Sequence, residues 1–196
     1  MAEALLISNL LLWGVVIVLA VLVIALARQV GVLYERVAPA GALMVNSRVR
    51  PGEPGPEMDV TDLDGRVLHV GGASVDGKGL MLFFTSPTCP VCKSLLPALI
   101  SAARSEKSWL RVILVSDGEE SEHRAYIAAN GLKEFPYVNS PIVGARYGVS
   151  KLPYAVLLDE KGVIVSMGIV NSREHLESLF ESRERGVASI QEHLRG

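Results

Sequence analysis

The sequence predicts an α/β fold, a mixed sheet with helices on both faces, preceded by one N-terminal transmembrane helix. Three observations predict it. Residues 4–27 contain no charged side chain. The apolar runs 79–85 and 110–116 are each followed by a segment with the composition of a helix. Two later strands, joined by a turn at Lys161-Gly162, precede a last helix. Alternating strands and helices followed by an antiparallel pair of strands are typical of a mixed sheet covered on both faces.

The first element is the apolar segment 4–27, with Trp13 near its start. As a helix it spans about 36 Å at 1.5 Å per residue, which is enough to cross a hydrocarbon core of about 30 Å. A cleaved signal peptide is the alternative, because Ala25-Leu26-Ala27 resembles a cleavage site. The long apolar stretch and the absence of a positively charged segment before it favour an uncleaved membrane anchor.

The side of the membrane on which the rest of the chain lies is less clear from the sequence. Arg28, Arg36, Arg48 and Arg50 follow the apolar segment, whereas only Glu3 and the α-amino group precede it. The positive-inside rule alone therefore places the following domain in the cytoplasm. The cysteine chemistry described below favours the periplasm instead, so the two signals conflict.

The composition of the chain changes after the apolar segment. Proline and glycine recur after residue 38 and favour extended or turning backbone, which suits a tether that lets a domain stand away from a membrane. The predicted organisation is an anchor with a juxtamembrane helix at 1–37, a Pro/Gly-rich linker at 38–57, a folded domain at 58–185 and a C-terminal tail at 186–196.

The domain begins with a predicted β-hairpin, in which residues 58–63 and 66–70 are joined by an Asp64-Gly65 turn. The next run, 79–85, is continuously apolar. A short apolar run of this kind is typical of a strand that is covered on both faces.

The rest of the domain continues the alternation. Residues 90–104 are predicted to form a helix with one apolar side, and residues 119–130 a polar helix that ends at Gly131. An irregular stretch is expected around residues 136–141. The last predicted elements are a short helix at 142–147, strands at 155–158 and 163–167, and a helix at 172–185.

Composition excludes several kinds of partner. The chain has 196 residues, and its 19 basic and 21 acidic residues give a formal net charge of −2. Such a charge offers no broad basic surface for nucleic acid. The histidines lack the spacing of metal ligands, so we expect neither a nucleic-acid partner nor a metal; they are His69, His123, His175 and His193.

Cys89 and Cys92 are the only cysteines, and they lie where the buried strand ends and a helix begins. The unpaired N–H groups and positive dipole at a helix N-terminus stabilise a thiolate. Cys89 is therefore expected to be the nucleophile. Pro90 suits the first helical turn, which needs no N–H at that position. Cys92, one turn later, is expected to face inward and to resolve a mixed disulfide on Cys89.

Three other interpretations of the cysteine pair were weighed. Half of a zinc site would need a second pair of cysteine or histidine ligands, which the sequence lacks. A structural disulfide closing so small a ring would constrain the unfolded chain little. Two unrelated core cysteines are the last alternative. A redox pair is the interpretation we favour.

A second motif makes a family resemblance specific. Pro153 lies directly before the predicted strand 155–158, and Pro97 lies within the helix that follows the cysteines. Thioredoxin-like proteins have a Cys-x-x-Cys at a strand-to-helix junction, a proline that kinks the following helix, and a cis-proline beside the active-site sulfurs. Residues 50–185 resemble that family. The resemblance implies that Pro153 presents substrate backbone, with a substrate surface formed by Pro90, Val91, Leu152 and Tyr154.

Within the thioredoxin-like proteins, the chain is most similar to the membrane-tethered group that includes cytochrome c maturation proteins. The run 83–92 and the Leu152-Pro153-Tyr154 turn make the whole chain resemble the MauD family of methylamine utilization proteins. That resemblance implies a domain in the periplasm, anchored in the bacterial inner membrane. It further implies the small (beta) subunit of methylamine dehydrogenase as protein substrate. The sequence has no cofactor motif, so the expected redox group is the Cys89–Cys92 disulfide alone. An anchored domain of this kind has no electron source of its own, so we also expect a membrane redox partner.

Departures from thioredoxin itself indicate a specialised pair. Thr88 replaces the usual tryptophan, and Phe83 stands where thioredoxins bury an aspartate that relays protons to the second cysteine. Proton transfer to Cys92 must then use water or a partner. The Pro-Val dipeptide at 90–91 resembles oxidising or isomerising members, which favours disulfide formation or isomerisation over general reduction.

Other functions remain open at this point. A thiol reductant for apocytochrome c is one, and a chaperone or docking module with incidental thiols is another. A peroxiredoxin is a poor match, because that family's motif, aligned on Cys89, needs proline in place of Leu82 and threonine in place of Ser86.

Overall fold

The computed structural model describes residues 2–36 and 49–185. The chain divides into two compact units, residues 1–42 and 43–196. In the first unit, helix α1 (Ala2–Arg36) continues beyond the apolar segment 4–27. Most of the predicted linker, residues 38–48, and the predicted tail, residues 186–196, lie outside the described residues.

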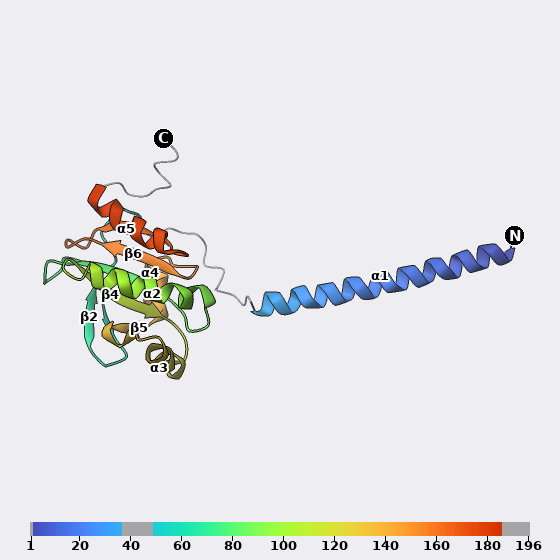
Figure 1. The fold of residues 1–196 in the computed structure, drawn as a ribbon, viewed down its shortest axis with the longest axis horizontal. Helices are drawn as coiled ribbons and strands as arrows, with labels where there is room; N and C mark the ends of the chain where they lie inside the picture. The colour runs from blue at the N-terminus through green and yellow to red at the C-terminus, as the bar shows by residue number, and fades with distance from the viewer. Residues whose placement is uncertain (1, 37–48, 186–196) are drawn as a thin grey trace. The chain divides into compact units, whose positions relative to one another are not determined.

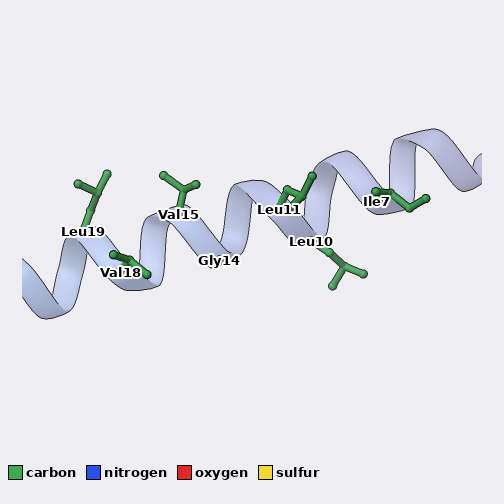
Figure 2. A pocket seen from close by; sticks show the side chains of 7 residues that line it. All are labelled: Ile7, Leu10, Leu11, Gly14, Val15, Val18 and Leu19. Atoms are coloured by element: carbon green, nitrogen blue, oxygen red, sulfur yellow. The ribbon is translucent and has the colours of Figure 1, made fainter.

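Helix α1 carries the apolar segment. Its stretch Ile7–Ile24 is long and apolar enough to cross a membrane. A helix that is apolar on every side has no polar face to turn toward water, which is typical of a membrane span. Figure 2 shows apolar side chains projecting from successive turns of α1, and all of them are exposed: Ile7, Leu10, Leu11, Val15, Val18 and Leu19.

The second unit is built on a five-stranded mixed sheet in the order β5-β4-β3-β6-β7 (Figure 1). Strand β3 is parallel to β4 and antiparallel to β6, while β5 continues the parallel side and β7 the antiparallel side. The strands are β3 (Gly79–Phe84), β4 (Leu110–Ser116), β5 (Tyr137–Asn139), β6 (Tyr154–Leu158) and β7 (Ile164–Ile169). The predicted hairpin forms a separate antiparallel pair, β1 (Met58–Thr61) and β2 (Val67–Val70).

Apolar side chains from the central strand β3 point into a core on each side of the sheet, and all six of its residues are buried. Met81 and Phe83 belong to the core that α2 and α5 cover, whereas Leu82 and Phe84 belong to the core that α4 and the hairpin cover. Alternation along a strand explains this division. The helices are α2 (Pro90–Ser105), α3 (Glu120–Ala129), the 3₁₀ turn η1 (Leu132–Glu134), α4 (Pro141–Arg146) and α5 (Arg173–Arg185).

Residues 49–56 enter the domain along the edge of the sheet. The N–H of Gly52 donates to the carbonyl of Ile164, and the N–H of Ile164 donates to the carbonyl of Glu53, at 2.8 and 2.9 Å. Val49 is buried in the core on the α4 side. The sequence interpretation placed these residues in the linker, because proline and glycine interrupt regular structure. The same composition allows a turning chain to dock on β7 and to cover its unpaired backbone.

Strand β5 also differs from the prediction, which expected irregular backbone around residues 136–141. Tyr137 and Asn139 pair in parallel with Leu114 and Ser116 of β4. The four residues between Pro136 and Pro141 carry no strand periodicity of their own. Pairing with the edge of β4 supplies the hydrogen bonds that define this strand.

Candidate redox site

Cys89 and Cys92 are joined by a disulfide at the start of helix α2. Cys89 is the N-cap residue, and Cys92 lies in the first turn. The side chain of Cys92 is fully buried, while Cys89 is partly exposed. Cys89 is therefore the more accessible of the two cysteines to another protein.

The backbone of the first turn of α2 is directed at Cys89. The N–H of Cys92 donates to Cys89 Sγ at 3.1 Å, and the N–H of Lys93 donates to the Cys89 carbonyl at 3.2 Å. Pro90 occupies a first-turn position, where its missing N–H leaves no hydrogen bond unmade. After reduction the same N–H and the helix dipole favour a thiolate on Cys89 over a thiol.

The loop before Cys89 is tied to itself by its own side chains. Ser86 Oγ lies 3.0 Å from Thr88 Oγ1 and accepts the N–H of Thr88 at 3.3 Å. The N–H of Cys89 donates to the carbonyl of Ser86 at 3.2 Å. Sequence reasoning did not assign these hydroxyls, although a serine two residues before a threonine is a signal for such a turn. They fix the path of the chain from the sheet to Cys89.

The predicted cis-proline lies at the same end of the sheet. The Leu152-Pro153 peptide bond is cis, Pro153 is buried, and its carbonyl accepts the N–H of Val170 at 3.0 Å. The next residue, Tyr154, pairs with Phe84, the last residue of β3. The strand register therefore brings Pro153 to the end of the sheet from which the chain leads to Cys89.

The residues predicted to form a substrate surface lie at the start of helix α2 and at the start of strand β6. Pro90 and Val91 are exposed on the first turn of α2, and Leu152 is exposed before β6. Tyr154 is partly buried, and burial raises the pKa of its phenol, so the hydroxyl stays protonated at neutral pH. The sequence interpretation missed Ile169, an exposed apolar residue that pairs with Tyr154 across the sheet.

Phe83 is fully buried among apolar side chains of α2 and α5. At this position the protein therefore supplies an aromatic ring, with no carboxylate to receive the proton of Cys92. Within residues 2–36 and 49–185, no group of three or more histidine, cysteine, aspartate or glutamate side chains could hold a metal ion.

Comparisons with known proteins agree with this architecture. A family model described as thioredoxin-like matches residues 77–164. The chain is 45% identical over 188 residues to methylamine utilization protein MauD of Methylobacillus flagellatus, which covers 96% of this chain and 91% of that one. It is 41% identical to MauD of Paracoccus denitrificans, with coverage of 99% and 96%. The chain belongs to the MauD family of methylamine utilization proteins.

Solved structures show the same fold. A thiol:disulfide interchange protein DsbE from Chlorobium tepidum superimposes with a TM-score of 0.60, covering 71% of this chain and 99% of that one at 18% identity. Membership of the MauD family, the thioredoxin-like fold and the Cys89–Cys92 disulfide together make the chain a thioredoxin-like thiol–disulfide oxidoreductase. Its redox role belongs to methylamine utilization.

Proposed function

We propose that the chain is a membrane-anchored periplasmic oxidoreductase that forms or isomerises disulfides in the small subunit of methylamine dehydrogenase during maturation of that enzyme. One observation carries the proposal. The Cys89–Cys92 disulfide lies at a helix N-terminus, with Cys89 partly exposed and Cys92 buried. The family to which the chain belongs is named for methylamine utilization.

The first step of the proposed reaction forms a mixed disulfide. A substrate thiolate attacks Cys89 Sγ, a new S–S bond forms to the substrate, and the Cys89–Cys92 bond breaks. The electron pair of that bond leaves on Cys92, which then takes up a proton. Because Phe83 occupies the position of the usual acid, water or the bound substrate supplies this proton.

The second step releases the product. A second substrate thiolate attacks the substrate sulfur of the mixed disulfide, so a disulfide forms in the substrate and Cys89 leaves as a thiolate. The Cys92 N–H, 3.1 Å from Cys89 Sγ, stabilises that thiolate. Two electrons have moved from the substrate to the cysteine pair, which now holds a Cys92 thiol and a Cys89 thiolate. A membrane redox partner that accepts them restores the disulfide.

Substrate binding uses the surface around Cys89. The cis turn at Pro153 presents the backbone of an extended substrate segment to Cys89. Pro90 and Val91 contact the substrate from α2, and Leu152 and Tyr154 contact it from the start of β6. The exposure of Val91 and Leu152, 43% and 37%, supports this role, because such apolar side chains gain contacts only when another chain covers them.

The periplasmic location is supported by chemistry rather than by charge. A disulfide that exchanges with folding proteins persists in an oxidising compartment. Helix α1 is long and apolar enough to hold the domain at the inner membrane.

Replacing Cys89 tests the proposed function. In a bacterium that grows on methylamine and lacks its own copy of the protein, we expect Cys89→Ala to abolish active methylamine dehydrogenase and its correctly paired small subunit. The matched control is Lys93→Ala, an exposed residue of the same helical turn, which should restore both. Full maturation with Cys89→Ala would show that the thiols are incidental and that the protein acts as a chaperone. Loss of cytochrome c alone would indicate an apocytochrome reductant.

A further inference from the structure

Two buried hydroxyls connect helix α3 to the end of strand β3. Thr85 Oγ1 lies 3.0 Å from the hydroxyl of Tyr126. Thr85 is fully buried and Tyr126 is 4% exposed. A buried hydroxyl without a partner is costly, so each of the two holds the other in place. The backbone of Thr85 is also fixed, because its N–H donates to the carbonyl of Val115 at 2.9 Å.

Helix α3 is itself anchored close to Tyr126. The buried ring of His123 contacts the hydroxyl of Tyr137 through Nδ1 at 3.0 Å and the carbonyl of Asp117 through Nε2 at 3.1 Å. Arg124 donates to the carbonyl of Leu63 at 2.7 Å. These contacts tie the helix to strand β5 and to the hairpin, so the hydroxyl of Tyr126 is a fixed point.

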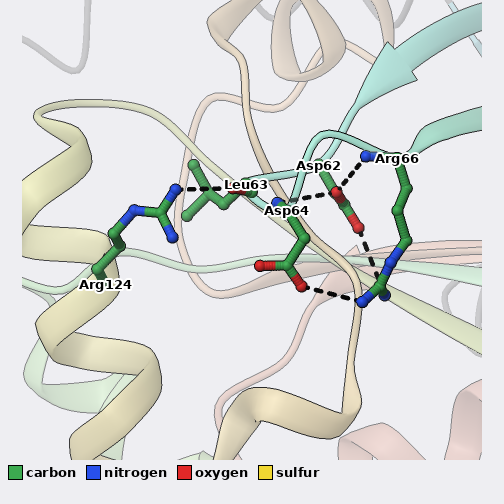
Figure 3. Close-up of polar contacts among 5 residues, drawn as sticks. All are labelled: Asp62, Leu63, Asp64, Arg66 and Arg124. Atoms are coloured by element: carbon green, nitrogen blue, oxygen red, sulfur yellow. Dashed lines mark hydrogen bonds and ion pairs between the residues drawn. The ribbon is translucent and has the colours of Figure 1, made fainter.

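Figure 3 shows how the hairpin loop that receives Arg124 is held. Asp62, whose side chain is buried, accepts the N–H groups of Asp64 and Arg66 through one oxygen at 2.9 and 2.8 Å. The adjoining Leu63 donates its N–H to the carbonyl of Tyr137 at 2.9 Å. The loop is therefore fixed both internally and to β5, and it gives Arg124 a stable acceptor.

The link from Thr85 to Cys89 is short and stiff. Three residues separate them, and two are tied by the Ser86–Thr88 hydrogen bonds. The third, Pro87, has a fixed φ. A displacement of Thr85 is therefore carried to Cys89, whose sulfur must stay near the N–H of Cys92 for its thiolate to be stabilised.

We propose that Thr85 and Tyr126 are positioning residues for disulfide exchange, because their hydrogen bond fixes the loop that places Cys89 Sγ against the N-terminus of α2. The inference rests on the proposed role of Cys89 as nucleophile. Neither residue touches the reacting sulfurs. Their hydrogen bond sets how strongly the helix N-terminus stabilises the Cys89 thiolate.

The test measures the rate at which iodoacetamide alkylates the Cys89 thiol, as a function of pH, in reduced full-length protein in detergent. Cys92 is buried and therefore reacts slowly. Thr85→Val keeps the shape of the side chain and removes its hydroxyl, and Tyr126→Phe removes the partner. We expect both variants to move the pH profile of iodoacetamide alkylation upward and to slow alkylation at pH 7 by about three- to tenfold. The reduction potential, measured against glutathione, should fall, because the thiolate form is less stabilised. Thr85→Ser should restore both properties.

Two controls separate positioning from general stability. Tyr137→Phe removes another buried hydrogen bond of α3, one that does not involve the active-site loop. It should destabilise the fold and shift the alkylation profile less than Thr85→Val and Tyr126→Phe do, because the Thr85–Tyr126 bond and the Arg124 contact remain. The double variant Thr85→Val/Tyr126→Phe should match the more affected single variant, since both remove one interaction.

The proposal is wrong if Thr85→Val and Tyr126→Phe lower stability as Tyr137→Phe does while the alkylation profile stays at its wild-type position. If Thr85→Val does not fold, Tyr126→Phe gives the same decision. These measurements need no substrate subunit. They therefore remain decisive if methylamine dehydrogenase proves not to be the substrate, whereas an unreactive Cys89 in the wild-type protein would count against the proposed function itself.

Discussion

At the scale of single residues, the two cysteines differ in access and in surroundings. Cys89 is partly exposed and accepts the N–H of Cys92, whereas Cys92 is enclosed. The helix N-terminus therefore stabilises charge on the sulfur that we propose to meet the substrate. Phe83 has no carboxyl group, so it cannot donate a proton to a Cys92 thiolate. The asymmetry favours Cys89 as the sulfur that remains linked to a partner during exchange.

The pKa of a buried tyrosine gives a prediction at this scale. Burial raises the pKa of Tyr137 to about 12, above its ordinary value near 10. The folded state therefore holds the phenol proton more tightly than the unfolded state does. The resulting stabilisation is present below pH 10 and is lost as the pH rises toward 12. We expect the free energy of unfolding to fall across that range.

The matched measurement uses Tyr137→Phe. This variant should be less stable at pH 7, because the contact with His123 is gone, and its stability should fall less steeply between pH 10 and 12. Urea unfolding of the full-length protein at a series of pH values distinguishes the cases. Equal slopes in both proteins would show that Tyr137 does not carry the alkaline loss.

At the scale of elements, the sequence predicted the parts that local pattern determines. The continuous apolar run at β3 can only be a covered element, and the cysteine pair with Pro90 marks the helix that follows. The Asp64-Gly65 dipeptide predicted the hairpin turn, where Gly65 has a positive φ. The resemblance to thioredoxin-like proteins added the cis peptide bond before Pro153. These features require no knowledge of distant contacts.

Other elements depend on contacts that no local pattern reveals. Strand β5 exists because β4 offers it a paired edge. The partner of Thr85 lies 41 residues away along the chain, so its role was not predictable. One signal was present: His123 and Tyr126 lie three residues apart, and hence on one face of the helix. A buried polar pair on such a face would have been a reasonable expectation.

Two turn glycines give a prediction at the element scale. Gly65 and Gly162 both adopt positive φ, +82° and +79°. A side chain at Gly65 would meet nothing within 4 Å, whereas one at Gly162 would overlap the backbone of Gly72. We expect Gly65→Ala to cost about 1–2 kcal/mol from backbone strain alone. Gly162→Ala should cost about 1–3 kcal/mol more, from overlap in a packed region.

Urea unfolding of the two full-length variants compares these costs. Gly65→Ala serves as the control for backbone conformation, because it changes φ preference without a steric clash. Equal losses of stability would mean that the approach of Gly162 to Gly72 is not as close as the structure has it.

At the scale of the whole molecule, the chain combines a helix suited to a membrane with a domain suited to an oxidising compartment. The arginines after the apolar segment 4–27 favour a cytoplasmic domain, while the disulfide favours the periplasm. We give the cysteine chemistry more weight, because the proposed reaction needs an oxidised pair.

A reporter fused to the C-terminus decides between the two orientations. Alkaline phosphatase becomes active only in the periplasm, so the proposed topology predicts high phosphatase activity from the full-length fusion. A fusion of β-galactosidase at the same point is the complementary control and should be inactive. The opposite pair of results would place Cys89 in the cytoplasm and would remove the proposed substrate from its reach.

The most direct test of the account is to trap the partner of Cys89. The Cys92→Ala variant keeps the Cys89 thiolate, which attacks a disulfide of the substrate as isomerisation requires. It lacks the second thiol of the pair, so nothing within the protein releases the resulting mixed disulfide. In cells growing on methylamine, we predict that this variant accumulates as a disulfide-linked complex with the methylamine dehydrogenase small subunit, visible on non-reducing gels and absent after reduction. The Cys89→Ala/Cys92→Ala variant is the control. If no disulfide-linked partner appears with Cys92→Ala under those conditions, the exchange reaction assigned to Cys89 is contradicted.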